Sequence, residues 1–148
     1  MRLPLIYHLD TNIVIAYFNG NQVVANKLKT YLPHVSINAL VLGELLYGAK
    51  TSQRKDENLE KVYQFLHIVN VVDFNQACAE QYSHIRASLR KKGRPTGETD
   101  ALIAAIALAH DATLVTDNIK HFQNIDGLIL ENWLPEQVVK QELSEKGI

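Results

Sequence analysis

The chain has 148 residues and a net charge of −1, from 15 Lys and Arg residues against 16 Asp and Glu residues. Hydrophobic residues make up 47% and charged residues 21%, which excludes a disordered or collagen-like chain and predicts a single domain over residues 1–148. A net charge near zero also excludes binding to nucleic acid through the field of the whole molecule, so any such contact needs a local positive patch.

The first part of the chain alternates between strand-like and helical patterns. In order, we expect a strand at residues 3–9, a helix over residues 13–18, a helix over residues 23–32, a strand at residues 35–38 and a helix over residues 39–49. The first strand ends at Asp10, and Thr11 has the side chain of a helix N-cap. This junction brings polar groups to the carboxyl end of a predicted strand.

The second part continues the alternation. In order, we expect a helix over residues 55–69, a strand at 69–72, a helix over 78–92, a helix over 101–109, and strands at 113–116 and 128–130. Gly93 and Pro95 end the helix that precedes them. Strands that alternate with helices predict an α/β fold with a mostly parallel sheet of about four to five strands, covered by helices on both faces.

The sequence also predicts where the protein resides. The longest apolar runs, such as residues 101–109, are shorter than the roughly 20 residues that a membrane span needs. The single cysteine, Cys78, forms no internal disulfide and fits a small position in the core. We therefore expect a soluble protein of the cytoplasm.

Three acidic residues stand at or near the ends of predicted elements. Asp10 follows the first strand, Asp117 follows the strand at residues 113–116, and Asp100 begins a helix after a glycine-containing loop. In open parallel sheets the ligand lies at the carboxyl ends of the strands. We therefore expect these carboxylates to lie near one another in a binding crevice.

A fourth acid, Glu44, has an unusual predicted setting. The helical period places it on one face of its helix together with Leu40, Val41, Tyr47 and Gly48, which predicts a buried carboxylate. Four converging carboxylates would repel one another unless a divalent cation lies between them, and Mg²⁺ or Mn²⁺ prefers such oxygen ligands. A cation of this kind activates water and stabilises the charge on a phosphate during in-line displacement.

Each acid also has an ordinary structural explanation. Asp10 and Asp100 suit helix N-termini, where capping and the helix dipole favour acids. Asp117 with Asn118 is a common turn pair. An unpaired buried glutamate is harder to explain in this way, and the four acids together favour a metal-dependent site for chemistry on a phosphate.

Four blocks of sequence and the end of the chain resemble the PIN-domain toxins called VapC. The blocks are residues 9–13 (LDTNI), 42–49 (LGELLYGA), 99–105 (TDALIAA) and 114–118 (LVTDN), and the tail is residues 122–133. The resemblance covers nearly the whole chain. It implies a PIN-like three-layer α/β/α fold and a Mg²⁺-dependent endoribonuclease that cuts tRNA or ribosomal RNA. It also implies a homodimer that a cognate VapB-like antitoxin holds inactive.

The resemblance assigns the site residue by residue. By position, Asp10, Glu44 and Asp100 take three acidic roles in catalysis and metal binding. Many relatives place the last acid two residues after the threonine, where this chain has Asn118, whereas its own acid, Asp117, lies one residue after. We predict that Asp117 is the fourth acid and that Asn118 is a neutral oxygen donor or holds a water.

Other polar residues are predicted to support these acids. Thr11, Asn12 and Thr116 carry short hydroxyl or amide groups suited to holding a carboxylate or a metal-bound water, and helix capping explains them equally well. Glu98 either adds to the metal site or begins its helix. A basic run is predicted to bring RNA phosphates toward the acids unless it only complements a helix C-terminus, and it consists of Arg86, Arg90, Lys91, Lys92 and Arg94.

Other functions have weaker support. A haloacid-dehalogenase-like phosphatase needs a second Asp two residues after the first, where this chain has Asn12. A nucleotide-binding module needs a GxxxxGKS, GxxxxGKT or GxGxxG loop, which the chain lacks, and the six scattered histidines do not have the spacing of a zinc site. A PIN-like module that binds RNA or a protein without cutting stays open, because the shift at Asp117 and Asn118 leaves room for a weakened site.

Overall fold

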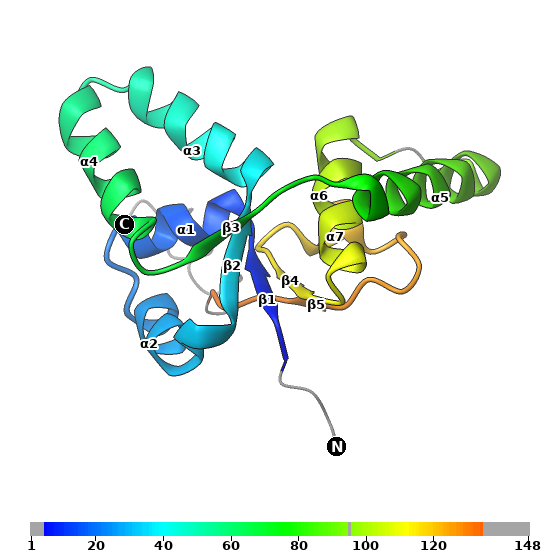
Figure 1. The fold of residues 1–148 in the computed structure, drawn as a ribbon, viewed down its shortest axis with the longest axis horizontal. Helices are drawn as coiled ribbons and strands as arrows, with labels where there is room; N and C mark the ends of the chain where they lie inside the picture. Colours follow the sequence, from blue (N-terminus) through cyan, green and yellow to red (C-terminus); the bar gives the residue numbers. More distant parts are fainter. Residues whose placement is uncertain (1–4, 95, 135–148) are drawn as a thin grey trace, which may run out of the picture.

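A computed structural model describes residues 5–94 and 96–134 of the chain. The strands of this part are β1 (Tyr7–Leu9), β2 (Val35–Asn38), β3 (Asn70–Val72), β4 (Thr113–Val115) and β5 (Leu130–Glu131). The helices are α1 (Thr11–Phe18), α2 (Gln22–Tyr31), α3 (Ala39–Lys50), α4 (Lys55–Phe65), α5 (Gln76–Lys92), α6 (Glu98–Ala109) and α7 (Ile119–Phe122), and η1 (Leu32–His34) is a 3₁₀ turn (Figure 1).

The five strands form one parallel sheet in the order β3-β2-β1-β4-β5. Tyr7 of β1 lies beside Val35 of β2 on one side and Thr113 of β4 on the other. The chain leaves β1 toward β2 and β3 and later returns to the other side of β1, so the strand order reverses between β1 and β4. Such a reversal opens a crevice at the carboxyl ends of the strands.

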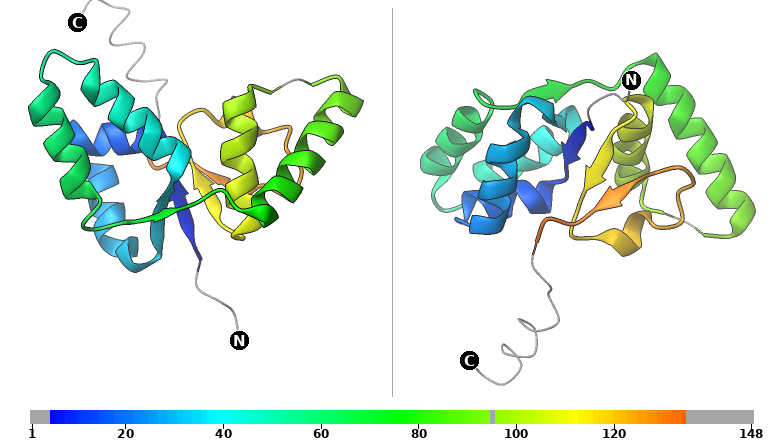
Figure 2. Two further views of the ribbon diagram at one scale, coloured as in Figure 1. Left: turned by 45° about the horizontal axis from the view of Figure 1, so that its top comes forward. Right: turned by 90° about the horizontal axis from the view of Figure 1, so that it is seen from below.

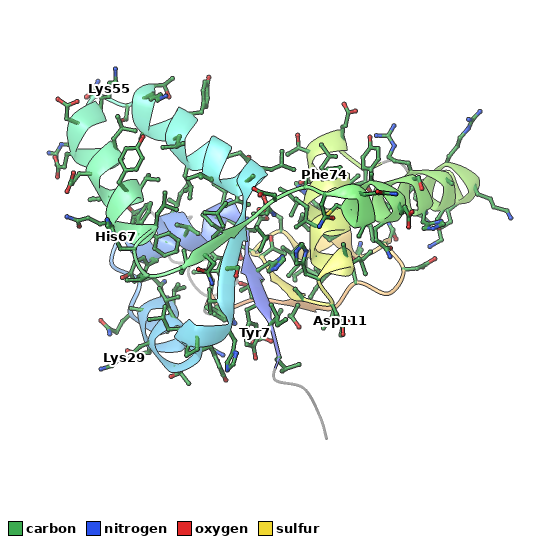
Figure 3. All side chains as sticks on the ribbon, in the orientation of Figure 1. Tyr7, Lys29, Lys55, His67, Phe74 and Asp111 are labelled. Carbon is green, nitrogen blue, oxygen red and sulfur yellow. The ribbon has the colours of Figure 1, made fainter. Side chains whose placement is uncertain are left out.

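Helices cover both sides of this sheet, which confirms the predicted three-layer α/β fold. In Figure 1, α1 to α4 lie on one side of β1 and β2, and α5 to α7 lie on the other. The α3–α4 pair and the α5–α6 pair extend away from each other as two arms (Figure 2). The central strand β1 and its neighbour β4 are buried, and Leu9, Leu114 and Val115 are fully inaccessible to solvent. Side chains on the two arms therefore flank the carboxyl ends of the central strands (Figure 3).

The junction after β1 differs from the prediction in one detail. The N-cap of α1 is Asp10, whose Oδ1 accepts a hydrogen bond from the backbone N–H of Thr11 at 2.9 Å. Thr11 is the first residue of the helix. The prediction of a Thr11 cap was wrong because Asp caps a helix as well as Thr does and stands one residue earlier. Thr11 is thereby free to use its hydroxyl elsewhere.

The prediction of a buried Glu44 was also wrong. The face of α3 that packs into the core carries Val41, Leu45 and Ala49, whereas Glu44 is exposed and Tyr47 is 71% exposed. Apolar residues occupy nearly every side of this helix, so their spacing does not fix which side faces the core. Glu44 therefore lies on the outer edge of α3, where it meets other polar groups.

The remaining differences lie at the ends of elements. The first strand begins at Tyr7, and residues 3 and 4 of its predicted span lie outside the described residues. The helix predicted over residues 55–69 ends at Phe65, the last strand lies at Leu130–Glu131, and α7 was not predicted. Gly93 ends α5 as expected, with a left-handed backbone at φ 66° that glycine adopts without strain.

The described helices also bear on membranes. Within residues 5–94 and 96–134, none combines the length and the apolar character required to cross a bilayer. The single cysteine, Cys78, is fully buried, as expected for a small core residue. Figure 3 shows that side chains of charged residues such as Lys29 and Lys55 project outward from the helices.

Candidate active site

Asp10 lies at the centre of the predicted site. It follows β1 directly, its backbone N–H donates to Val115 O of β4 at 2.9 Å, and its side chain is only 7% exposed. Oδ2 accepts a hydrogen bond from Thr116 Oγ1 at 2.8 Å and a longer one from Asn12 Nδ2 at 3.4 Å. Groups from two neighbouring strand ends therefore fix both the position and the rotation of this carboxylate.

Glu44 approaches Asp10 from α3. Its Oε1 accepts a hydrogen bond from the Thr11 hydroxyl at 3.0 Å, so Thr11 connects the start of α1 to the acid of α3. Desolvation raises the pKa of Glu44, the Thr11 bond opposes this rise, and the negative charges of Asp10 and Asp100 add to it. Although Glu44 is exposed, the charges of two other acids therefore act on its carboxyl group.

Asp100 completes the group from the first turn of α6. Desolvation raises its pKa, the nearby His121 lowers it, and the charge of Asp10 raises it again. His121 Nδ1 lies 3.4 Å from Asp100 Oδ2. The charges of Asp10 and Asp100 thus raise the pKa of Glu44, and the charge of Asp10 raises the pKa of Asp100. We name Asp10, Glu44 and Asp100, which come from three separate elements, the acid cluster.

Asp117 lies beside this cluster at the end of β4 and is held by its own contacts. Its backbone N–H donates to Asn12 Oδ1 at 3.0 Å, and its Oδ1 accepts from Asn132 Nδ2 at 3.0 Å. The backbone N–H of Asn118 donates to Thr116 Oγ1 at 3.0 Å. Within the described part of the chain, only Asp10 and Asp100 are among the charges that raise the pKa of Glu44, and Asp117 is not. The role of Asp117 as the fourth acid therefore stays a prediction.

Comparison with known proteins shows the family of this chain. The family model described as "PIN domain" matches residues 7–128. The chain belongs to the PIN-domain family. It is 41% identical over 137 residues to ribonuclease VapC2 of Rickettsia felis, across 87% of this chain and 98% of the relative. It is 34% identical over 128 residues to a tRNA(fMet)-specific endonuclease VapC of Shigella flexneri, across 86% of this chain and 97% of the relative.

Solved structures agree with this membership. A chain of the VapBC2 complex of Rickettsia felis, bound to a DNA fragment from their promoter, is 40% identical with a TM-score of 0.83, across 88% of this chain and all (100%) of that chain. A chain of DNA-bound VapBC from Salmonella typhimurium is 31% identical with the same TM-score of 0.83 and the same coverage, 88% and 100%. The resemblance to VapC toxins and the PIN-like fold are confirmed, and the haloacid-dehalogenase-like alternative is not supported.

The donor set of this PIN domain fits a hard divalent cation. Mg²⁺ keeps several waters and binds through one or two carboxylates, and the acid cluster offers oxygen atoms at the carboxyl end of the sheet. In the described residues, no group of three His, Cys, Asp or Glu side chains is arranged to hold one ion together. A cation at this site would therefore be held by one or two carboxylates together with retained water.

Glu98 lies at the start of α6 but interacts with α5. Its Oε1 accepts a hydrogen bond from Tyr82 OH at 3.4 Å, and Arg86 Nη1 donates to the same hydroxyl at 3.3 Å. The Arg86 guanidinium also lies over the Tyr82 ring, 5.7 Å from its centroid. The described contacts of Glu98 therefore join it to α5 rather than to the acid cluster of this PIN domain.

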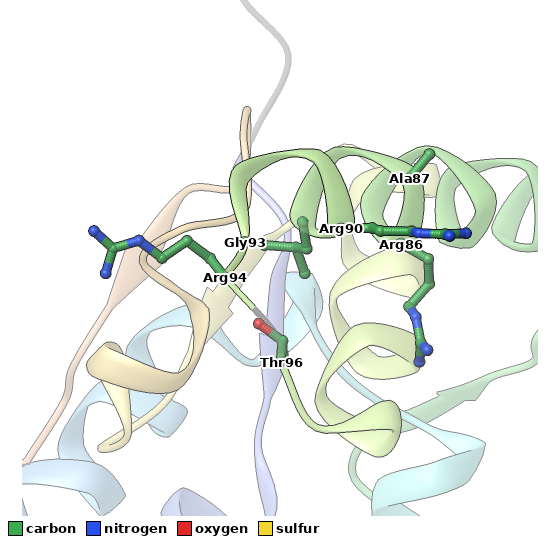
Figure 4. A pocket seen from close by; sticks show the side chains of 7 residues that line it. Arg86, Ala87, Arg90, Gly93, Arg94 and Thr96 are labelled. Carbon is green, nitrogen blue, oxygen red and sulfur yellow. The ribbon is translucent and has the colours of Figure 1, made fainter.

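The predicted basic run divides into two groups. Arg86, Arg90 and Arg94 line a hollow of about 530 Å³ at the end of α5, together with Thr96 (Figure 4). Lys92 instead pairs with Asp126 Oδ1 at 2.7 Å and donates to Asn124 O at 3.2 Å, while Lys91 is exposed. All five residues remain predicted RNA contacts, and Lys92 also holds the loop after α7.

The prediction from sequence missed two polar residues of this site. Asn132 follows β5 and binds Asp117, and His121 in α7 binds Asp100. Asn132 could have been found by the rule that identified Asp10 and Asp117, because it also follows a strand end. His121 gave no signal, because a helix of 4 residues is too short to show periodicity.

Proposed function

We propose that this protein is an endoribonuclease, the toxin of a VapBC-like toxin–antitoxin pair, that hydrolyses phosphodiester bonds in tRNA or another structured RNA. One observation carries the proposal: Asp10, Glu44 and Asp100 lie near one another at the carboxyl end of a PIN-domain sheet, where the charge of Asp10 acts on both other acids. Relatives at 41% and 34% identity are named ribonuclease and tRNA-specific endonuclease. Hydrolysis of a phosphodiester bond is commonly catalysed by a divalent cation that such carboxylates bind.

The acid cluster would hold Mg²⁺ or Mn²⁺, with Asp117 and Asn118 as further oxygen donors beside it. A cation bound there supplies Lewis-acid stabilisation of the charge that grows on the phosphate. Thr116 and Asn12 orient Asp10 by bonds to its Oδ2, and Thr11 orients Glu44. A carboxylate that is not ligating orients the attacking water.

The protein partner would be a VapB-like antitoxin. Chains in VapBC complexes of Rickettsia felis, Salmonella typhimurium and nontypeable Haemophilus influenzae match this chain at 40%, 31% and 33% identity. We also expect a homodimer, and we expect the protein to act in the cytoplasm, where its RNA substrate is found. Sedimentation of the purified protein with and without its antitoxin tests the assembly.

The first test is tightly induced expression of the wild type, Asp100→Ala and a control, Glu60→Ala. Glu60 is an exposed acid in the middle of α4, away from the acid cluster. Growth is followed, and the 5′ ends of cellular RNA are sequenced after induction. We expect arrested growth and discrete new ends in one RNA class with the wild type and the control, and neither with Asp100→Ala.

The same experiment distinguishes cutting from binding. Normal growth and unchanged RNA in all three strains, with soluble folded protein, would contradict nuclease activity and favour a PIN-like module that binds RNA or protein. Purified protein gives a second measurement, because cleavage of the mapped RNA should stop with EDTA and return when Mg²⁺ or Mn²⁺ is added in excess.

A further inference from the structure

A second hollow borders the acid cluster, and most of the residues that line it are not members of the cluster. It encloses about 380 Å³ and is lined by Thr96, Gly97, Asp100, Lys120, His121 and Asn124. Asp100 is a member of both the hollow and the acid cluster, so the two regions share one wall. The other walls come from the loop before α6 and from α7 with the residue pair that follows it. We name this hollow the Lys120 pocket.

The chemistry of the Lys120 pocket suits an anion. Lys120 is exposed, and no acid of the described residues lies within ion-pair distance of it. The Thr96 hydroxyl and the Asn124 amide add neutral hydrogen-bond donors. A lysine ammonium acts toward phosphate as a compact point charge with three donors. The lining residues include no large apolar side chain that would favour a hydrophobic ligand.

The backbone around the pocket is held in place by packing. Phe122 of α7 is fully buried, which leaves Lys120 and His121 on the opposite, exposed side of the helix. Lys92 of α5 donates to Asn124 O at 3.2 Å and pairs with Asp126 at 2.7 Å, so α5 fixes the loop that follows α7. The pocket therefore belongs to the folded framework and does not depend on a ligand to form.

Electrostatics give the pocket a role in RNA binding. An RNA strand that presents one phosphate to the acid cluster brings its neighbouring phosphates close to the same negative charges. A cation on the far side of Asp100 offsets that repulsion for one neighbour. Gly97 helps, because it has no side chain beside Asp100, where a Cβ would lie 3.4 Å from Asp100 Oδ2.

We propose that the Lys120 pocket binds the RNA phosphate next to the scissile phosphate, with the Lys120 ammonium as its cation and Thr96 and Asn124 as neutral donors. This inference rests on the proposed function, because it assigns a substrate subsite beside the same acids. It predicts that Lys120 contributes to the affinity for the RNA backbone and that this contribution does not depend on the base sequence.

The test compares Lys120→Ala and Lys120→Arg with Lys29→Ala as the matched control. Lys29 is an exposed lysine on α2, well away from α6 and α7 (Figure 3). Cleavage of the mapped RNA is measured at several salt concentrations. We expect Lys120→Ala to raise KM roughly five- to tenfold with kcat changed less than about twofold, and to reduce the slope of log KM against log salt by about 0.7 to 1. Lys120→Arg and Lys29→Ala should match the wild type within about twofold.

A second measurement locates the phosphate. Each phosphate near the cleavage site is replaced in turn by an uncharged methylphosphonate. One replacement next to the scissile bond should raise KM for the wild type and leave KM for Lys120→Ala unchanged, because the variant has already lost the partner of that charge. If every replacement raises KM equally in both proteins, Lys120 contacts none of these phosphates.

The outcomes separate this inference from the function on which it rests. Wild-type protein that cuts no RNA contradicts the proposed function, and the phosphate subsite with it. Wild-type protein that cuts normally, together with Lys120→Ala that matches Lys29→Ala in KM and in salt slope, contradicts the phosphate subsite alone. A loss of kcat without a change in KM also contradicts it, because a neighbouring phosphate contact acts equally before and during the reaction.

Discussion

Lowering the pH should destabilise this PIN domain through one buried imidazole. His8 lies in the middle of β1 between β2 and β4, and its ring is 1% exposed. Among the described residues, no group forms a hydrogen bond with Nδ1, and the ring of His110 lies 5.4 Å away between centroids. Desolvation, with a smaller effect of His110, lowers the pKa of His8 from 6.5 to about 4. The neutral imidazole is therefore the form that the fold accepts.

The size of the effect follows from the two pKa values of His8. In the unfolded chain the imidazole takes up a proton near pH 6.5, whereas in the fold it does so only near pH 4. Above pH 6.5 the imidazole is neutral in both states and the unfolding free energy has its full value. As the pH falls from 6.5 toward 4, only the unfolded state takes up the proton, and the unfolding free energy decreases. A shift of this size corresponds to roughly 3 kcal/mol of unfolding free energy, because one pKa unit equals about 1.4 kcal/mol.

Urea denaturation between pH 7 and pH 4 measures this loss. The unfolding free energies of the wild type, His8→Leu and the exposed control His84→Gln are compared, because the difference between proteins removes the contribution of other titrating groups. The wild type and the control should lose about 3 kcal/mol more than His8→Leu. A parallel pH dependence in all three proteins, or an NMR titration of the His8 ring near pH 6.5, would refute the reasoning.

Three further predictions concern the site. Thr11→Val removes the hydrogen bond that lowers the pKa of Glu44, so the acid limb of the pH–kcat profile should move to higher pH if ionised Glu44 is required. Thr116→Val removes the 2.8 Å bond to Asp10 Oδ2 and should lower kcat about tenfold or more with a smaller change in KM, whereas Thr116→Ser should keep most activity. Lys92→Ala breaks an exposed ion pair and should lower the midpoint of thermal denaturation only slightly, with a smaller rise in KM than Lys120→Ala.

The sequence predicted the parts of the fold that local physics decides. Asp10 and Asp117 were expected near each other because parallel strands bring their carboxyl ends to one edge of the sheet, and the structure joins both to Asn12. The boundaries of β2 were exact, since turn residues and a strong cap at Asn38 surround it. Gly93 ended α5 because its left-handed backbone strains other residues.

The errors have physical causes that are not local. Glu44 was placed on the wrong face because α3 is apolar on nearly all sides, and only the packing of Val41, Leu45 and Ala49 selects its buried face. The pairing of Lys92 with Asp126, which lies 34 residues further along the chain, was not predicted, and the RNA contact of Lys92 stays a prediction. A single sequence contains no signal for a pairing of that kind.

Without a bound cation, the wild type should be less stable than a variant in which one carboxylate of the acid cluster is replaced by a neutral amide. The folded-state pKa of Asp100 is raised by desolvation and by Asp10, so the ionised side chain at neutral pH disfavours the fold, and protonation as the pH falls removes that cost. Asp100→Asn should therefore raise the unfolding free energy by about 1 kcal/mol or less in EDTA while abolishing cleavage. Excess Mg²⁺ should then stabilise the wild type more than the variant in calorimetry, because the cation compensates a charge that the variant lacks. Equal or lower stability of Asp100→Asn in EDTA would show that the hydrogen bond to His121 outweighs the repulsion, and that the carboxylates tolerate one another without a cation.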